Sequence, residues 1–166
     1  MNYQIITLDE FTGDKATIYS ILPEGENLTL YDKFVEEYCT DYYDDILSIA
    51  DLLIDMGCKY GIRENLIKTK EGKPGDGVVA IFDNPDKNLR LYGIRYGASI
   101  LLLGSGGVKG QEVMAWQDDA KLKKEAEIVI QISKEVSKRV QDREINISLD
   151  HMRLTGNLNF LNNDDK

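Results

Sequence analysis

Histidine and cysteine are scarce in this sequence of 166 residues, which contains one histidine, His151, and two cysteines, Cys39 and Cys58. The single histidine excludes a metal site with several histidine ligands, and the cysteines lack the close spacing of a zinc-binding pair. A histidine-dependent triad would rest on His151 alone, and no serine or cysteine lies in a recognisable nucleophile motif. We therefore expect no metal and no other cofactor.

Long apolar segments are also lacking. The longest apolar run extends from Ala98 to Leu103 and is interrupted by Ser99, whereas a bilayer-spanning helix needs roughly 20 apolar residues. Residues 1–10 contain neither the basic patch nor the apolar stretch of a signal peptide. These absences predict a cytoplasmic protein with reduced thiols and no membrane contact.

Positive charge is the minority and is unevenly distributed. The chain carries 29 acidic and 20 basic side chains, a net charge of −9, which argues against nucleic-acid binding by bulk electrostatics. Residues 1–60 hold 13 acids and three lysines, whereas residues 61–124 hold 11 bases and eight acids. We expect no DNA binding of this chain alone, but a local basic face on an acidic protein is compatible with this distribution.

The apolar pattern predicts a single α+β domain over residues 1–161, in which helices pack a small antiparallel sheet. Its acidic part, residues 1–58, begins with strands at 3–8 and 16–22. A helical hairpin or kinked pair follows, whose second helix is capped by Thr40 or Asp41 and stops at Gly57. Asp41, Asp44 and Asp45 share one turn of that helix; they are open to interpretation as a carboxylate site or, more simply, as a solvated acidic surface.

The remainder of the chain divides into three elements and a tail. Residues 59–117 contain an antiparallel meander with strands at 78–82, 89–96 and 99–103. Residues 118–143 form a long helix with an apolar stripe of six residues, Leu122, Ala126, Val129, Ile132, Val136 and Val140. Residues 145–161 form a terminal hairpin of two short strands around Thr155-Gly156-Asn157, and residues 162–166 form a mobile tail.

Four small residues, Gly104-Ser105-Gly106-Gly107, follow the last strand of the meander. Such a loop cradles phosphate only where a helix begins at once, and the next residues, Val108-Lys109-Gly110, do not start a helix. The spacing predicts a flexible turn that leads to Lys109.

Two arginines stand out in the strand 89–96. Arg90 and Arg95 are five positions apart, an odd spacing, so their side chains lie on opposite faces. Tyr92 and Tyr96 lie on the side of Arg90. Whichever face is the core, the arginine on it needs a partner or a cleft. A structural salt bridge and a phosphate-binding guanidinium are both compatible with the pattern.

The 22 residues from Asn88 to Lys109, with two strand arginines, an apolar strand and a following lysine, resemble the core hairpin of the RelE/HigB superfamily of toxins. The order of elements over residues 30–143 is similar as well. The resemblance implies a small antiparallel sheet with helices on one side. To this fold the chain adds the acidic N-terminal part, a longer C-terminal helix and the terminal strands.

The same resemblance implies a bacterial, cytoplasmic toxin that is restrained by an antitoxin protein and inhibits translation as a metal-independent mRNA endoribonuclease acting on RNA at the ribosome. It assigns catalysis to Arg90, Arg95 and Lys109, whose charges would hold the phosphate and the developing negative charge. It assigns substrate binding to four further side chains, Lys68, Lys70, Tyr92 and Tyr96.

A second hypothesis follows from the acidic composition. The chain would then be a non-catalytic interaction module that reuses this fold and binds a protein partner through its acidic helices. A basic cleft in which Arg90, Arg95, Lys68 and Lys109 meet a tyrosine would favour the nuclease. Arginines that are engaged in structural bridges would favour the interaction module.

Overall fold

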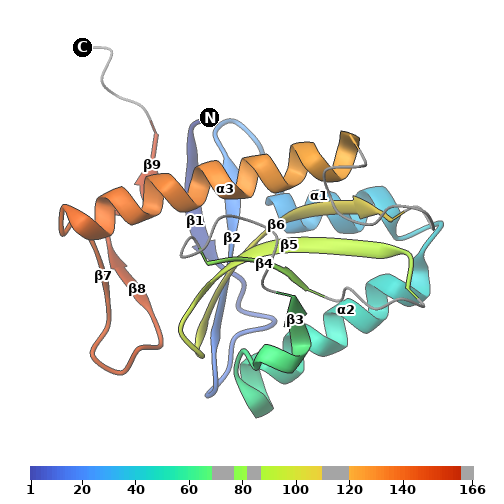
Figure 1. Cartoon of the computed structure of the whole chain (residues 1–166), viewed down its shortest axis with the longest axis horizontal. Coiled ribbons are helices and arrows are strands. Elements are labelled where there is room, and N and C mark those ends of the chain that lie inside the picture. Colours follow the sequence, from blue (N-terminus) through green and yellow to red (C-terminus); the bar gives the residue numbers. More distant parts are fainter. Residues whose placement is uncertain (69–76, 82–86, 110–119, 162–166) are drawn as a thin grey trace.

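The computed structural model describes residues 1–68, 77–81, 87–109 and 120–161, which form an α+β structure (Figure 1). The expected α+β class, the long C-terminal helix and the added terminal strands are confirmed. The helices are α1 (Leu30–Tyr38), α2 (Tyr43–Asp55) and α3 (Ala120–Gln141). The strands of the main sheet are β1 (Tyr3–Thr7), β2 (Thr17–Pro23), β3 (Ile67–Lys68), β4 (Val78–Ile81), β5 (Leu89–Tyr96), β6 (Ile100–Val108) and β9 (Asn159–Phe160).

The main sheet has the strand order β3-β4-β5-β6-β2-β1-β9. The predicted meander is present as the antiparallel neighbours β4, β5 and β6. One pairing differs from the expected antiparallel pattern, because β2 runs parallel to β6, with Thr17 opposite Ile100. Side chains of β2 are buried on both faces of the sheet, as is typical of a strand in the interior of a sheet covered on both sides. The sheet is therefore mixed.

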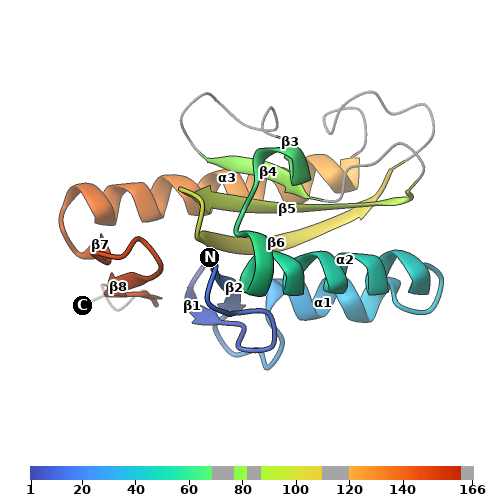
Figure 2. The same cartoon turned by 90° about the horizontal axis from the view of Figure 1, so that it is seen from below.

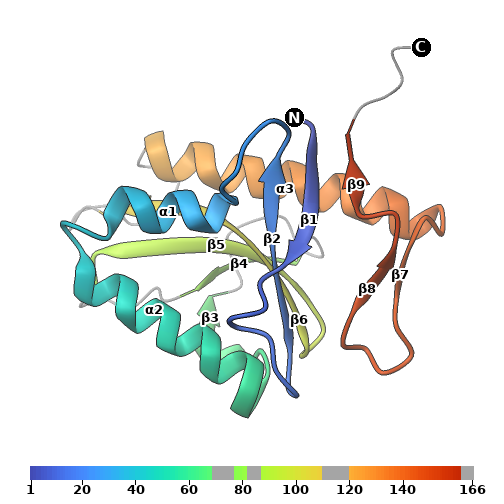
Figure 3. The same cartoon turned by 180° about the vertical axis from the view of Figure 1, so that it is seen from behind.

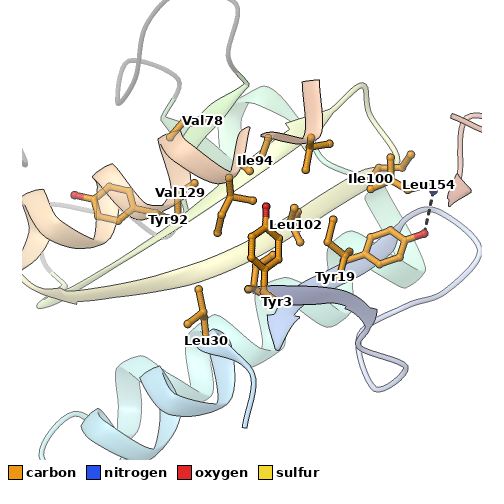
Figure 4. Packing of buried hydrophobic residues seen from close by; sticks show 14 of the residues in the cluster. Tyr3, Tyr19, Leu30, Val78, Tyr92, Ile94, Ile100, Leu102, Val129 and Leu154 are labelled. Carbon is orange, nitrogen blue, oxygen red and sulfur yellow. Dashed lines mark hydrogen bonds between the residues drawn. The ribbon is translucent and has the colours of Figure 1, made fainter. Parts of the chain in front are cut away.

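Helices cover both faces of this sheet, and not one side as the toxin resemblance implied. On one face, α3 packs its buried stripe against Tyr92, Ile94 and Leu102 (Figure 4). On the other face, α1 and α2 pack Phe34 and Leu53 into a second cluster with residues of β5 and β6. The antiparallel pair α1–α2 lies together at one side of the sheet, as Figures 2 and 3 show.

The boundaries of the helical pair follow local chemistry. Thr29 caps α1: its Oγ1 accepts a hydrogen bond from the Asp32 N–H at 3.1 Å, and its own N–H donates to the Asp32 carboxylate. The expected caps at Thr40 or Asp41 were wrong by one or two residues, because α2 begins after Tyr42, which makes no side-chain cap.

The expected stop at Gly57 was also wrong. The chain continues beyond α2 as a π-helical turn from Met56 to Tyr60 and leaves it at Gly61, whose φ of 74° is left-handed. A Cβ atom at Gly57 would overlap the carbonyl oxygen of Phe11. The Gly57 carbonyl also accepts hydrogen bonds from the N–H groups of Lys15 and Ala16. Glycine is therefore needed here for close contact with the β1–β2 connection.

The terminal hairpin is present, but its turn lies elsewhere. Strands β7 (Ile145–Ile147) and β8 (Leu154–Gly156) form a separate two-stranded sheet. Thr155 and Gly156, expected in the turn, belong to β8, and the turn spans residues 148–153. Side chains build this turn, since Asp150 accepts hydrogen bonds from the Ser148 hydroxyl and from the Met152 N–H. The predicted tail, residues 162–166, lies outside the described residues.

Strand β9 extends the main sheet beyond β1, with Tyr3 opposite Phe160. The Arg139 side chain of α3 donates hydrogen bonds to the carbonyls of Asn157 and Asn159 and stacks its guanidinium 3.7 Å from the Phe160 ring centroid. One cationic side chain of the long helix thus holds the C-terminal strand in place.

Candidate functional site

Strand β5 separates the two arginines that the sequence singled out. Leu89 and Leu91 pack towards α1 and α2, whereas Tyr92 and Ile94 pack towards α3, so the alternation places Arg90 and Arg95 on opposite faces. At about 3.3 Å per residue they are also roughly 16 Å apart along the strand. These two guanidinium groups do not converge on one pocket.

Arg95 takes part in an ion pair. Its Nη2 lies 3.5 Å from the carboxylate of Glu64, which is 81% exposed, and its own side chain is 25% exposed. The N–H of Arg95 donates to the carbonyl of Gly77. An exposed pair of this kind contributes about 0–1 kcal/mol. The geometry matches the salt-bridge interpretation of this arginine.

Arg90 and Lys109 lie at the same end of the sheet. Arg90 is opposite Gly107, and the N–H of Lys109 donates to the Asn88 carbonyl at 2.7 Å. The Arg90 side chain is only 3% exposed, so it lies within the protein and not on a surface open to RNA. Of the three predicted catalytic residues, Arg90 and Lys109 therefore lie at the same end of the sheet, whereas Arg95 lies towards the opposite end of β5.

Lys121 of α3 lies at this end as well, and carboxylates surround it. Its Nζ is 3.1 Å from Glu37 of α1 and 3.6 Å from Glu125 of α3. Burial alone would lower the pKa of Lys121, but the hydrogen bond to Glu37 and the neighbouring Tyr38 and Glu125 raise it. Burial raises the pKa of Glu125, and Lys121 opposes that rise. The ion pair between Lys121 and Glu37 thus links α3 to α1 beside β6.

The predicted substrate-binding residues are dispersed. Tyr92 is completely buried in the cluster beneath α3 (Figure 4), and Tyr96 packs against the same cluster. Burial raises the pKa of Tyr96. Lys68 ends the short strand β3 at the sheet edge opposite β9; Lys70 and the side chain of Lys68 lie outside what the structure describes. A small open pocket beside β1 and β2 includes Glu24 and Glu26 in its lining but none of these residues.

The predicted flexible turn at Gly104–Gly107 was wrong, because β6 continues through it to Val108. The register with β5 shifts between Leu91 and Gly93, which places the bulge at Gly104 and Ser105. A Cβ at Gly104 would overlap a methyl group of Val129 in α3. The missing side chain at Gly104 lets α3 pack closely against β6. The segment is therefore part of a strand and not a phosphate-binding loop.

Asp41, Asp44 and Asp45, which were expected to share one turn of the second helix, do not form one cluster, and Asp41 precedes α2. Asp41 and Asp44 are exposed, whereas Asp45 is buried and accepts hydrogen bonds from the N–H groups of Asn88 and Leu89 at 2.8 and 3.1 Å. Asp45 thereby ties α2 to the beginning of β5. In the described part of the chain, no group of three or more histidine, cysteine or acidic residues is placed to hold a metal ion.

Helix α2 carries an exposed apolar stripe that was not predicted from the sequence. Tyr43, Leu47 and Ile54 are 59%, 45% and 40% exposed, and Tyr60 is exposed in the π-helical turn beyond them. The spacing of four and seven residues, which places side chains on one helical face, was available in the sequence. It was obscured because Ile46, Ile49 and Leu53 form the stripe that faces the core.

Comparisons with protein-family models, with curated proteins and with solved structures gave no match. None of the described helices combines the length and apolar character that a membrane crossing requires.

Proposed function

We propose that this chain is a non-catalytic interaction module that binds a protein partner through its acidic helices, with α2 as the contact element. The observation that carries the proposal is the row of Tyr43, Leu47 and Ile54 on the outer face of α2. Single exposed apolar residues are common on protein surfaces, but a row along one helical face is typical of a helix that packs against a partner.

The stripe would form the apolar centre of an interface and not the whole of it. Fully burying a leucine-sized side chain contributes roughly 1.5–3 kcal/mol, but Tyr43, Leu47 and Ile54 are already about half buried, so each offers about half of that. Association costs about 4–15 kcal/mol in translational and rotational freedom. Contacts around the stripe, including those of the carboxylates along the same helix, would supply the remaining free energy.

Cross-linking in the native cells tests this function. A photoreactive phenylalanine analogue in place of Leu47 is expected to give one dominant protein cross-link. The same analogue in place of Glu127, which is exposed on α3 on the other side of the sheet, serves as the matched control and is expected to give none. Equal labelling from both positions, or none from Leu47, would rule out α2 as the contact element.

The toxin-like endoribonuclease is the second candidate, and the observation in its favour is that Arg90 and Lys109 share one end of the sheet. Against it, charge stabilisation of a transition state needs preorganised groups aimed at one point, and Arg95 faces the opposite side. An antitoxin would be the protein partner in this case.

Controlled induction in a bacterial host separates the two candidates. Under the interaction proposal, soluble expression of the chain leaves growth and protein synthesis unchanged. Growth arrest that is relieved by a folded Lys109→Ala or Arg95→Ala variant would contradict the proposal and favour the nuclease. Lys109 and Arg95 are both partly exposed, so their substitution is expected to preserve the fold, which circular dichroism verifies.

A further inference from the structure

The apolar stripe of α2 is narrow and straight. Successive helical residues are rotated by about 100°, so spacings of four and seven residues keep Tyr43, Leu47 and Ile54 within roughly 40° of one another. At 1.5 Å per residue the stripe is about 16 Å long. Helix α2 lies at the outer margin of the structure (Figures 1 and 3), and the three side chains of the stripe are exposed.

Carboxylates line one side of this stripe. Asp44, Asp51 and Asp55 follow it at the next angular positions of the helix. Asp44 and Asp51 are exposed and form no ion pair within the described part of the chain, whereas Asp55 lies 3.5 Å from Lys59. On the opposite side of the stripe the helix turns towards the buried Ile46 and Leu53. The exposed face of α2 is thus apolar along its middle and negative along its outer flank.

This charge distribution selects among possible occupants. Residues 30–60 carry eight carboxylates and two lysines, and the whole chain has a net charge of −9. A second copy of the chain would bring two negative flanks together, and like charges across an interface oppose association. RNA and DNA are disfavoured for the same reason. A segment with positive charge beside an apolar seam complements both parts of the surface.

The shape of the surface selects a helix. The backbone N–H and C=O groups of α2 are used within the helix, so this face offers no free strand edge for an extended peptide. Side chains that recur every three to four residues form ridges, which pack into the grooves of another helix. We infer that α2 binds a cationic amphipathic helix of a partner protein, whose apolar seam covers Tyr43, Leu47 and Ile54 and whose lysines or arginines face Asp44 and Asp51. This inference rests on the proposed function.

Two designed helical peptides of about five turns test it with the full chain. Both carry the same leucine seam, and one is flanked by lysine and arginine, the other by glutamate. The cationic peptide is expected to bind at least tenfold more tightly than the acidic one at low salt. Its affinity should fall as salt rises, since surface charge pairs are screened over about 10 Å at 0.1 M salt.

Matched variants locate the binding site. Leu47→Glu is expected to lower the affinity for the cationic peptide at least tenfold, whereas Val140→Glu, at an exposed apolar position of α3, leaves this affinity unchanged. Asp44→Asn and Asp51→Asn are expected to lower the affinity roughly threefold each at low salt, and Glu127→Gln serves as their control. Equal loss with Leu47→Glu and Val140→Glu would overturn the assignment to α2.

Other outcomes are distinguishable. Equal affinity for the two peptides would overturn the inference that the partner helix is cationic. Self-association of the chain that Leu47→Glu abolishes would assign the surface to a second copy and overturn the inference. If neither peptide binds while the cross-link from Leu47 persists, the cationic helix is wrong and the proposed function stands. If the cross-link is absent as well, both fail.

Discussion

Raising the pH from about 9 to about 11.5 is expected to unfold this protein cooperatively, because its core contains tyrosines that resist ionisation. Burial raises the pKa of Tyr3, Tyr19, Tyr31 and Tyr38, and it also raises that of Tyr96. At Tyr3 the hydrogen bond that its hydroxyl donates to Glu135, at 2.6 Å, adds to the effect of burial. Each of these groups is kept neutral by the folded state.

The sign follows from proton linkage. In the unfolded chain a tyrosine loses its proton near pH 10, whereas in the folded protein it keeps the proton to higher pH. Below pH 10 both states bind the proton and stability is unaffected; above it, the unfolded state is favoured by roughly 1.4 kcal/mol per tyrosine and pH unit. For Tyr3, Tyr31 and Tyr96, whose pKa values rise most, the cost is about 4 kcal/mol by pH 11 and about 6 kcal/mol by pH 11.5. Tyr19 and Tyr38 add to it in the same direction, and the total is comparable with the stability of a small domain.

Circular dichroism and tyrosinate absorbance, followed together, check this expectation. The two signals should change in one transition, and Tyr31→Phe should move its midpoint upward by a few tenths of a pH unit because one linked group is lost. Tyr43→Phe, at an exposed position, should leave the midpoint unchanged. Extensive tyrosinate absorbance well below the loss of helical signal would contradict the proposed linkage.

The elements that the sequence predicts best are those with a strong local period. The stripe Leu122, Ala126, Val129, Ile132 and Val136 identified α3, and all five residues are buried. Val140, assigned to the same stripe, is 37% exposed. The meander was equally predictable, because its three strands are neighbours in the chain as well as in space.

Pairings between distant segments could not be predicted in this way. The parallel contact of β2 with β6 joins residues about 80 positions apart, and no local pattern records which strand a buried strand will adjoin. The strand β9 is only two residues long, too short for any periodicity to be detected. Its position depends on Tyr3, Phe160 and Arg139, which are far apart in the sequence.

The odd spacing of Arg90 and Arg95 correctly predicted that their side chains lie on opposite faces of β5. The expectation that only one of these two faces belongs to the core was wrong. Both faces of β5 are covered by helices, and every residue from Leu89 to Ile94 is buried. The role of an arginine in such a strand therefore depends on the groups that its guanidinium contacts. The resemblance to the toxin hairpin supplied roles for these residues, but the dispersed arrangement does not support a common site.

The four small residues after the apolar strand show a related ambiguity. Glycine clusters are typical of loops, but glycine within a strand also marks a bulge or a close approach of another backbone. The sequence does not distinguish these cases, because the neighbour that excludes a side chain is distant in the chain. At Gly106 that neighbour is the carbonyl group of Arg90 in β5.

Gly106→Ala is therefore expected to destabilise the protein by about 3 kcal/mol, the upper part of the usual range for overpacking. The added Cβ would overlap the Arg90 carbonyl oxygen, and a backbone atom inside a paired strand moves only if the strands separate. Urea denaturation measures the loss as a lower transition midpoint with an unchanged slope.

Gly107→Ala, at the next position of the same strand, is the matched control. Its Cβ would lie 3.2 Å from Cγ of Lys121 and 3.3 Å from a methyl group of Leu122. These are side-chain atoms that adjust by a few tenths of an ångström, so we expect a loss below about 1 kcal/mol. Neither glycine has a left-handed φ, and both substitutions restrict the unfolded chain equally. The difference between the two variants therefore reports the close approach of β5 to β6, and equal losses would show that Gly106 is not required by that contact.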